Sequence, residues 1–179
     1  MGTMRVLVMY ESMFGNSERV ARAVADGLGA VAEVAVRDVT VSHAGDVPGG
    51  IDLLVVGGPT HALSLSRPST REEAFRQGAE QGLASRGLRE WLEGLPDDLH
   101  QLPCAAFDTR VSRVRRLPGS AARSATRMLR RHHGLLVAAA ESFFVDDVGG
   151  PLGEDELTRA RDWGARLGSV VLRDHAPAT

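Results

Sequence analysis

The sequence of 179 residues contains no lysine, and Cys104 is its single cysteine. Without lysine, the chain can neither form a Schiff base nor supply the phosphate-binding lysine of a P-loop. One cysteine allows no disulfide within the chain and no zinc or iron–sulfur site built from several cysteines. We expect Cys104 to be a small residue of the core. Any redox chemistry must therefore come from a bound cofactor.

Long hydrophobic runs are also missing. No uninterrupted apolar segment approaches the roughly 20 residues that span a bilayer, and the N-terminus lacks the order of basic, apolar and small residues of a secretory signal. We expect a cytoplasmic protein with no membrane span. The length and a hydrophobic content of 43% favour one domain. We assign it to residues 4–174, with residues 1–3 as a cloning extension and residues 175–179 as a frayed tail.

Short apolar runs alternate with helical patterns along the chain. Continuous runs are typical of strands buried on both faces of a parallel sheet, and they occur in RVLVMY, IDLLVVGG, LPCAAFD and GLLVAAA. The alternating segment VAEVAVRDV, from Val31, predicts an edge strand. Helices are predicted over residues 17–28, 70–94 with a break near 82–87, 120–133 and 157–167.

This order of elements predicts an α/β fold with a doubly wound, five-stranded parallel sheet, because parallel strands need crossover helices that cover both faces. In such sheets, ligands bind beyond the carboxyl ends of the strands, where the strand order reverses. The segments that fall there are YESMFGNS, GGPTHALSLSRPST and FDTRV. These three segments are the candidate binding loops.

The first segment, residues 10–17, has more short and polar side chains than a turn needs. Ser12, Gly15, Asn16 and Ser17 surround the start of a predicted helix, where four backbone N–H groups lack helical partners and the macrodipole is positive. Phosphate binds at such a helix start without a basic side chain. The alternative is an ordinary helix start, with Asn16 or Ser17 as the N-cap and Gly15 as a turn residue.

The stretch YESMFGNSERVA resembles the phosphate-binding loop of flavodoxins, especially the version Ser-Met-aromatic-Gly-Asn-Thr of flavodoxin domains in diiron flavoproteins. The resemblance implies a flavodoxin-like three-layer sandwich with strand order 2-1-3-4-5 and an FMN cofactor. It also implies a phosphate loop made of Ser12, Met13, Phe14, Gly15, Asn16 and Ser17. Phe14 stands where the commonest flavodoxin loop has threonine, which removes one hydroxyl contact.

By the same resemblance, the other two segments correspond to the loops that border the flavin ring. The residues implied are Pro59, Thr60, His61 and Ala62 from one loop, and Asp108, Thr109 and Arg110 from the other. Gly57 and Gly58, just before the first of these loops, are expected to leave room for a flat ring. The alternative is that each segment is an ordinary loop at a strand end.

Two features depart from the usual flavodoxin pattern. Neither ring loop contains Trp or Tyr, so only His61 and the strand-end Phe107 offer ring surfaces. A lost stacking partner costs roughly 1 kcal/mol, which predicts weak FMN retention or a pocket completed by a neighbouring subunit. Arg110 stands where flavodoxins generally have acidic surroundings. Its charge predicts a reduction potential raised by about 60 to 120 mV.

Eight arginines and no acidic residue lie from Arg110 to Arg131. The cluster is interpreted as a solvated helix face, or as a binding surface for an acidic redox partner, the 2′-phosphate of NADPH or nucleic acid. Nucleic acid is disfavoured because no aromatic platform accompanies the charges. The adjacent His132 and His133 point in different directions on a helix and are poor joint metal ligands, so no metal site is predicted.

Three functions agree with these observations. The first, favoured by the compact size, is an FMN-binding electron carrier for a redox partner protein. The second is an FMN-dependent reductase that takes hydride from NAD(P)H and reduces a small quinone-like acceptor, with His61 and Arg110 lining the substrate face. The third is a flavin-free interaction or regulatory module. No residue is assigned a catalytic role, and the oligomeric state is left open.

Two other doubly wound folds are disfavoured. A phosphoacceptor receiver domain needs an aspartate after the third strand, where this chain has GGPTH. A nicotinamide-type Rossmann domain needs G-x-G-x-x-G after the first strand, where this chain has YESMFGNS.

Overall fold

The computed structural model describes residues 3–174, so the tail predicted at residues 175–179 lies outside the described residues. Its five main strands are β1 (Met4–Tyr10), β2 (Ala32–Asp38), β3 (Leu53–His61), β5 (Pro103–Val111) and β7 (Glu141–Val145). They are parallel and lie in the order β2-β1-β3-β5-β7. This confirms the predicted order 2-1-3-4-5, and β2 is an edge strand as its alternating pattern predicts.

Two short strands extend the sheet. β4 (Ser64–Leu65) folds back antiparallel on the end of β3, and β6 (Leu135–Leu136) pairs with the beginning of β5. The fifth strand predicted over GLLVAAA is therefore wrong in position. Only its two leucines pair, whereas the strand proper is ESFFV, residues 141–145. Aromatic and β-branched side chains fill a sheet surface better than a run of alanines does.

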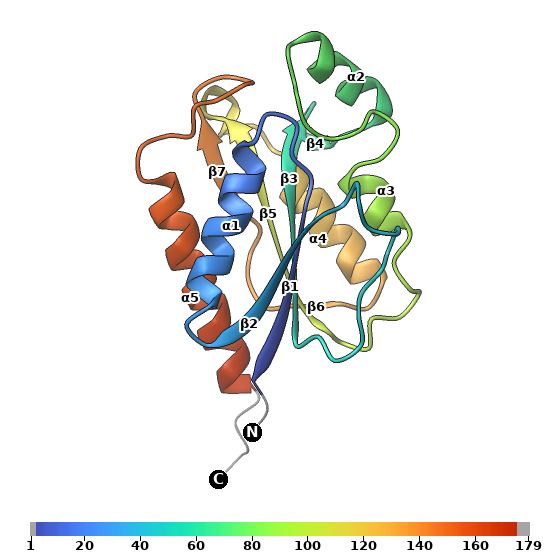
Figure 1. The fold of residues 1–179 in the computed structure, drawn as a ribbon, viewed down its shortest axis with the longest axis vertical. Coiled ribbons are helices and arrows are strands. Elements are labelled where there is room, and N and C mark those ends of the chain that lie inside the picture. Colours follow the sequence, from blue (N-terminus) through green and yellow to red (C-terminus); the bar gives the residue numbers. More distant parts are fainter. Residues whose placement is uncertain (1–2, 175–179) are drawn as a thin grey trace.

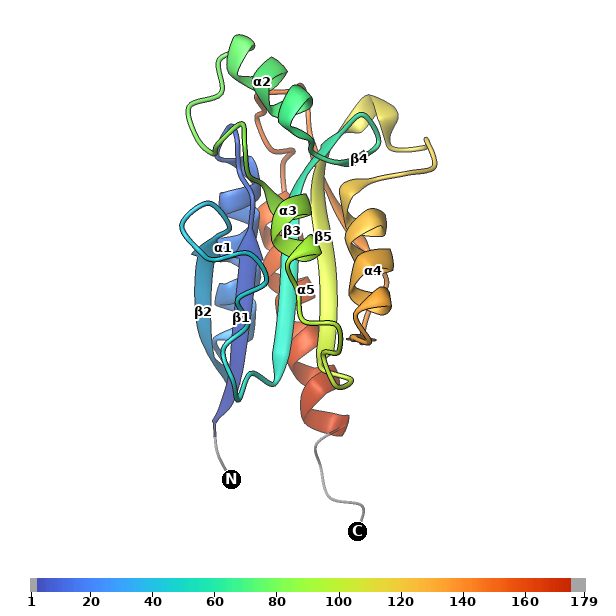
Figure 2. The same ribbon diagram turned by 90° about the vertical axis from the view of Figure 1, so that its right-hand side faces the viewer.

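Helices cover both faces of the sheet, which confirms the predicted three layers (Figure 1). Helices α1 (Asn16–Leu28) and α5 (Glu156–Asp174) cover one face, and α3 (Leu88–Glu93) and α4 (Ala121–Arg131) cover the other. Helix α2 (Pro68–Arg76) lies beyond the strand ends, near β4 (Figure 2). A 3₁₀ turn, η1 (Ser112–Val114), follows β5. The predicted break between residues 70 and 94 exists but extends from 77 to 87.

Alternation along the strands divides the apolar residues between two cores. On β1, Val6 and Val8 pack toward α1 and α5, while Leu7 and Met9 pack toward α3 and α4, since successive strand residues point to opposite faces. Cys104 is buried in the core between the sheet and helices α3 and α4, where burial raises the pKa of its thiol to about 12. This confirms its assignment as a core residue and keeps the thiol protonated.

The helices of residues 3–174 include none with both the length and the hydropathy that a membrane span requires. The cores instead lie between the sheet and its two helical layers. Because β1, β3 and β5 pair in parallel, their carboxyl ends lie at one edge of the sheet, where the three candidate loops are brought together.

Candidate functional site

Helix α1 begins directly behind β1, and its first turn has no side-chain cap. Gly15 is the N-cap residue, with a left-handed φ of 88° that glycine adopts at little cost. Ser12 Oγ accepts a hydrogen bond from the Gly15 N–H at 3.1 Å and thereby fixes the turn before the helix. Neither Asn16 nor Ser17 acts as the N-cap, which excludes the ordinary capped start. The first-turn N–H groups and the positive end of the dipole remain available to an anion.

Two hydroxyl groups join the start of α1 to the end of β5. Ser17 Oγ and Thr109 Oγ1 lie 2.7 Å apart and are both buried. A pair of hydroxyls carries two hydrogens and uses one for the bond between them. One hydrogen of the pair, and the hydrogen of the Ser12 hydroxyl, therefore remain free to donate to a ligand.

Arg110 brings a buried positive charge to the same place. Its side chain is 6% exposed, and Nη2 donates to the backbone carbonyls of Val114 and Leu117. Among residues 3–174, no carboxylate forms an ion pair with it, and its Nε has no hydrogen-bond partner. An arginine does not lose its proton in a protein, so this buried donor is unsatisfied until an acceptor arrives.

These groups line one cleft of about 70 Å³. Of the predicted residues, the cleft brings together Ser12, Met13, Phe14, Asn16, Ser17, Pro59, Thr60, His61, Thr109 and Arg110. Gly15, Ala62 and Asp108 do not line it. Its apolar side is completed by three valines that were not predicted, Val111, Val145 and Val148.

His61 enters the cleft as a neutral side chain. Burial, assisted by the nearby positive charge of Arg71, lowers its pKa to about 4. Its Nδ1 lies 3.1 Å from the Thr70 hydroxyl at the start of α2. At neutral pH, Arg110 is consequently the one charged side chain that lines the cleft.

Asp108 and Thr60 serve the start of a different helix. The Asp108 carboxylate is fully buried and accepts the Ala122 N–H at 2.9 Å, while Thr60 Oγ1 accepts the Ala121 N–H at 2.9 Å. Ser120 is the N-cap of α4, and its hydroxyl accepts from the Arg123 N–H. Asp108 lies on the face of β5 opposite to Thr109, because neighbouring strand residues alternate. The predicted ring loop is thus divided between two helix starts.

Two expectations about the flavin ring are wrong: that Gly57 and Gly58 leave room for it, and that Phe107 offers it a ring surface. A Cβ on Gly57 would lie 2.1 Å from the Phe107 ring, and a Cβ on Gly58 would lie 3.2 Å from Glu11 Cβ. These glycines therefore make room for the protein's own side chains. The Phe107 ring is fully buried and packs edge-on against Phe143 and Trp163 in the core below α5. It offers no stacking surface to a ligand.

A buried polar network beside the cleft was not identified from the sequence. Glu11, the residue before Ser12, accepts hydrogen bonds from the Ser66 hydroxyl at 2.6 Å and the Leu88 N–H at 2.7 Å. Burial raises the pKa of this carboxyl, against the opposing effects of both hydrogen bonds and of Arg71. The network ties the carboxyl end of β1 to the start of α3.

Arg71 completes this network from α2. Its side chain is fully buried, donates to Ser66 Oγ at 2.7 Å and pairs with Glu90 at 3.0 Å. Burial favours a higher pKa for Glu90, but hydrogen bonds with Arg71 and the Gly87 N–H hold that pKa below its usual value. The residues come from four separate segments, so no local pattern in the sequence could reveal them. Their effect is to fasten α2 and α3 beside the cleft.

In the described part of the chain, no three His, Cys, Asp or Glu residues gather as candidate ligands. His132 Nδ1 lies 2.8 Å from the Pro96 carbonyl oxygen. The cleft itself contains one buried cation and several hydroxyl groups.

The fold has clear counterparts among solved structures. Flavodoxin 2 from Bacillus cereus superposes with a TM-score of 0.67 at 17% identity, covering 95% of this chain and 99% of that one. A flavodoxin from the domain Archaea gives 0.60 at 16% identity, covering 94% and 99%. The Flv1 flavodiiron core from Synechocystis sp. PCC6803 gives 0.63 at 16% identity. The match covers 97% of this chain, which spans only 37% of that core.

Sequence comparison adds no relative to these. No protein-family model matches the chain, and no curated protein matches its sequence. At such low identities the solved structures establish the arrangement of strands and helices. The chain therefore has a flavodoxin-like fold.

Proposed function

We propose that this protein binds FMN at the cleft and acts in electron transfer. The observation that carries the proposal is the convergence, in one cleft, of an uncapped helix start, free hydroxyl donors and the unpartnered Nε of buried Arg110. Each of these groups favours an anion with several acceptor oxygens. A phosphomonoester has this chemistry, so the residues present fit the FMN phosphate.

The phosphate would be held by the first-turn N–H groups of α1, the Ser12 hydroxyl, the Ser17–Thr109 hydroxyl pair and Arg110. FMN, when bound, supplies the redox chemistry, while the protein supplies placement and electrostatics. Arg110 stabilises negative charge near the cleft, and its two backbone hydrogen bonds keep the guanidinium in place. His61, neutral because of its low pKa, adds no second charge.

The size of the cleft supports weak retention of FMN. Its volume is about 70 Å³, whereas pockets that enclose a whole ligand have roughly 300 Å³ or more. The lining contains Phe14 and His61 but no Trp or Tyr. Weak retention, or completion of the pocket by a neighbouring subunit, stays a prediction.

A second candidate function, an NAD(P)H-dependent reductase of quinone-like acceptors, is favoured by an adjoining groove. This groove of about 320 Å³ shares Thr60, His61 and Val148 with the cleft and continues along α2 to Gln77. Most of its lining surface is apolar. Helix α2 borders this groove, and its position beside the cleft weakens the argument from compact size for a simple carrier.

The experiment that separates these functions is a visible spectrum of the purified protein, recorded before and after addition of FMN and then after anaerobic addition of NADPH. A shifted flavin spectrum shows binding, and fast loss of visible absorption on adding NADPH shows a reductase. Binding without that loss supports a carrier. No binding of FMN would refute the proposal and leave a flavin-free module.

A further inference from the structure

A second cavity, of about 390 Å³, lies between β4, α3 and α4, apart from the FMN cleft. Three arginines line it, Arg89 from α3 and Arg127 and Arg131 from α4, together with the hydroxyls of Ser64 and Ser124. The surface of this cavity is mostly polar. It lies behind the β3–β4 hairpin, in which Ser64 pairs with the cleft residue His61.

The guanidinium of Arg89 is fixed by the hairpin. Its Nε donates to the Ser66 carbonyl at 2.9 Å, and its Nη2 donates to the Leu65 carbonyl at 2.7 Å and to Ser64 Oγ at 3.3 Å. These bonds use one edge of the planar group. Because a guanidinium carries five N–H donors, the Nη1 donors remain for a ligand.

Serine hydroxyls connect this arginine to the one on α4. Arg127 Nη2 donates to Ser124 Oγ at 3.0 Å, and Ser124 Oγ lies 3.1 Å from Ser64 Oγ. Two arginines from different elements are thus held through a pair of hydroxyls. The cations are arranged before any ligand binds, which lowers the entropy that binding has to overcome.

The charges of the cavity are not balanced by carboxylates. Among the described residues, Arg89, Arg127 and Arg131 form no ion pair, and Glu93 is the one acidic residue in the lining. Arg127 and Arg131 stand four residues apart on one helix, where like charges repel. The C-terminal dipole of α4 accounts for Arg131 but not for the other two.

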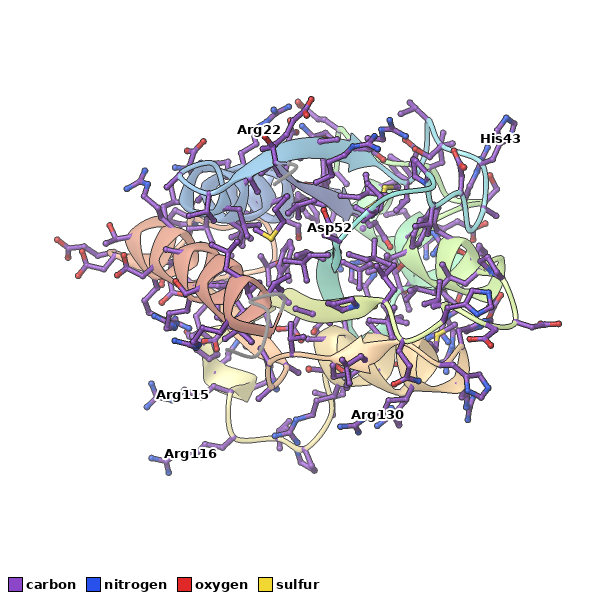
Figure 3. All side chains as sticks on the ribbon, turned by 90° about the horizontal axis from the view of Figure 1, so that it is seen from below. Arg22, His43, Asp52, Arg115, Arg116 and Arg130 are labelled. Atoms are coloured by element: carbon purple, nitrogen blue, oxygen red, sulfur yellow. The ribbon has the colours of Figure 1, made fainter. Side chains whose placement is uncertain are left out.

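We infer that this cavity binds a phosphomonoester dianion. Two to three guanidinium groups, and the one hydroxyl hydrogen that the Ser64–Ser124 bond does not use, supply the donors that the phosphate oxygens accept. The arginine-rich segment is thereby divided in function: Arg110 serves the cleft, Arg127 and Arg131 serve the cavity, and Arg115, Arg116 and Arg130 extend outward from the protein (Figure 3). The inference is independent of the proposed FMN site.

The test is a titration followed by NMR through the backbone amides. The probes are inorganic phosphate, 2′,5′-ADP and 5′-AMP, added to protein already saturated with FMN or, if FMN does not bind, to the protein alone. We expect saturable shifts at residues 124–132 and at Ser64, without matching shifts at residues 12–17. If 2′,5′-ADP binds at least tenfold tighter than 5′-AMP and phosphate, the dianion is the 2′-phosphate of a nucleotide. Equal affinity of all three probes identifies a simple phosphate site.

A double variant locates the site. Arg127→Gln with Arg131→Gln should weaken binding of the tightest probe at least tenfold. All four arginines are exposed, but Arg123 and Arg130 do not line the cavity, so the matched control, Arg123→Gln with Arg130→Gln, removes the same charge from the same helix and should change binding less than twofold. FMN affinity should be unchanged in both. Absence of saturable binding, or equal losses in both double variants, would overturn the inference.

Discussion

Helices α1 and α4 both begin at the carboxyl-end edge of the sheet, on opposite faces, and their first turns are completed in different ways. At α4, the protein supplies its own acceptors, with Ser120, Thr60 and the buried Asp108 carboxylate bonded to first-turn N–H groups. At α1, no side chain caps the helix. The first-turn N–H groups of α4 are therefore bonded to side chains of the protein, whereas those of α1 have no side-chain acceptor.

The charges near the two helix starts also differ, with a negative side chain at α4 and a positive one at α1. Asp108 places a negative charge at the positive end of the α4 dipole, where it is stabilising. Arg110, two residues further along β5, places an unpaired positive charge beside the cleft at α1. A cation at a helix N-terminus is unfavourable unless an anion joins it. The comparison supports the proposal that a ligand completes the start of α1, and each prediction below tests it.

The largest expected effect concerns the phosphate itself. Riboflavin, which lacks the phosphate, should bind about 100-fold more weakly than FMN, or about 2.7 kcal/mol, because it forgoes charge-assisted hydrogen bonds worth about 1.5 to 3 kcal/mol each. Flavin fluorescence titration measures both affinities.

Two variants test whether the difference in affinity between FMN and riboflavin arises at the start of α1. Ser12→Ala should weaken FMN binding about tenfold while changing riboflavin binding little, because it removes one hydroxyl donor. Ser120→Ala, the same substitution at the start of α4, should leave the ratio of FMN to riboflavin affinity unchanged. Equal affinity of the wild-type protein for the two flavins would contradict a phosphate site at α1.

The next effect concerns Arg110, the cation that lines the cleft at the start of α1. Arg110→Gln should weaken FMN binding, because Arg110 would hold the phosphate, and should lower the reduction potential of the FMN that still binds by up to about 60 to 120 mV, because a nearby positive charge favours added negative charge. A redox titration against dyes measures the change. Arg113→Gln is the control, since Arg113 is exposed and paired with Asp147 at 2.9 Å. If both variants have the wild-type potential, Arg110 does not act on the flavin.

The third effect concerns Asp108, whose carboxylate accepts a hydrogen bond from the first turn of α4. Asp108→Asn should lower the free energy of unfolding by about 1 to 2 kcal/mol, because a charged acceptor at the helix start becomes neutral. Chemical denaturation of the FMN-free protein measures this loss. FMN affinity should change less than threefold, since Asp108 does not line the cleft. A variant of unchanged stability that loses FMN would place Asp108 in the ligand site instead.

Much of the fold could be predicted because the signals are local. Continuous apolar runs and intervening helical periods predicted the order of strands, and the polar excess around Gly15 marked a candidate binding loop at a helix start, although it left an ordinary capped start as the alternative. GLLVAAA was misassigned because its apolar run resembles a strand, whereas pairing with the far half of β5 selects ESFFV. Apolar character alone does not decide which of two adjacent segments pairs.

The site was less predictable, because it depends on which way each side chain points and on what lies opposite. Alternation along β5 separates Asp108 from Thr109, and this could have been derived from the sequence. That Gly57 accommodates the Phe107 ring, or that Arg71 reaches Glu90 across Ser66, depends on contacts between distant segments. No single stretch of sequence contains that information.

The smallest expected effect tests His61, which ends β3 and lines the cleft. Its folded pKa of about 4 is below the unfolded value of 6.5, so the unfolded chain binds the proton more tightly. The stabilisation from neutral His61 is fully present above about pH 6.5 and is lost as the pH falls toward 4. After allowance for partial solvent screening, the loss should be about 1 kcal/mol at pH 5.5.

Denaturant unfolding of the FMN-free protein and of His61→Gln, measured from pH 8 to pH 4.5, checks this effect. Glutamine does not titrate, so the difference between the two free energies of unfolding should be constant from pH 7 to 8. Below pH 6.5, the wild-type protein should lose stability relative to the variant by about 1 kcal/mol at pH 5.5. Parallel curves over the whole range would mean that His61 keeps an ordinary pKa. The cleft would then gain a second cation in mild acid, and the contrast between a singly charged α1 side and the α4 side would hold only above pH 6.5.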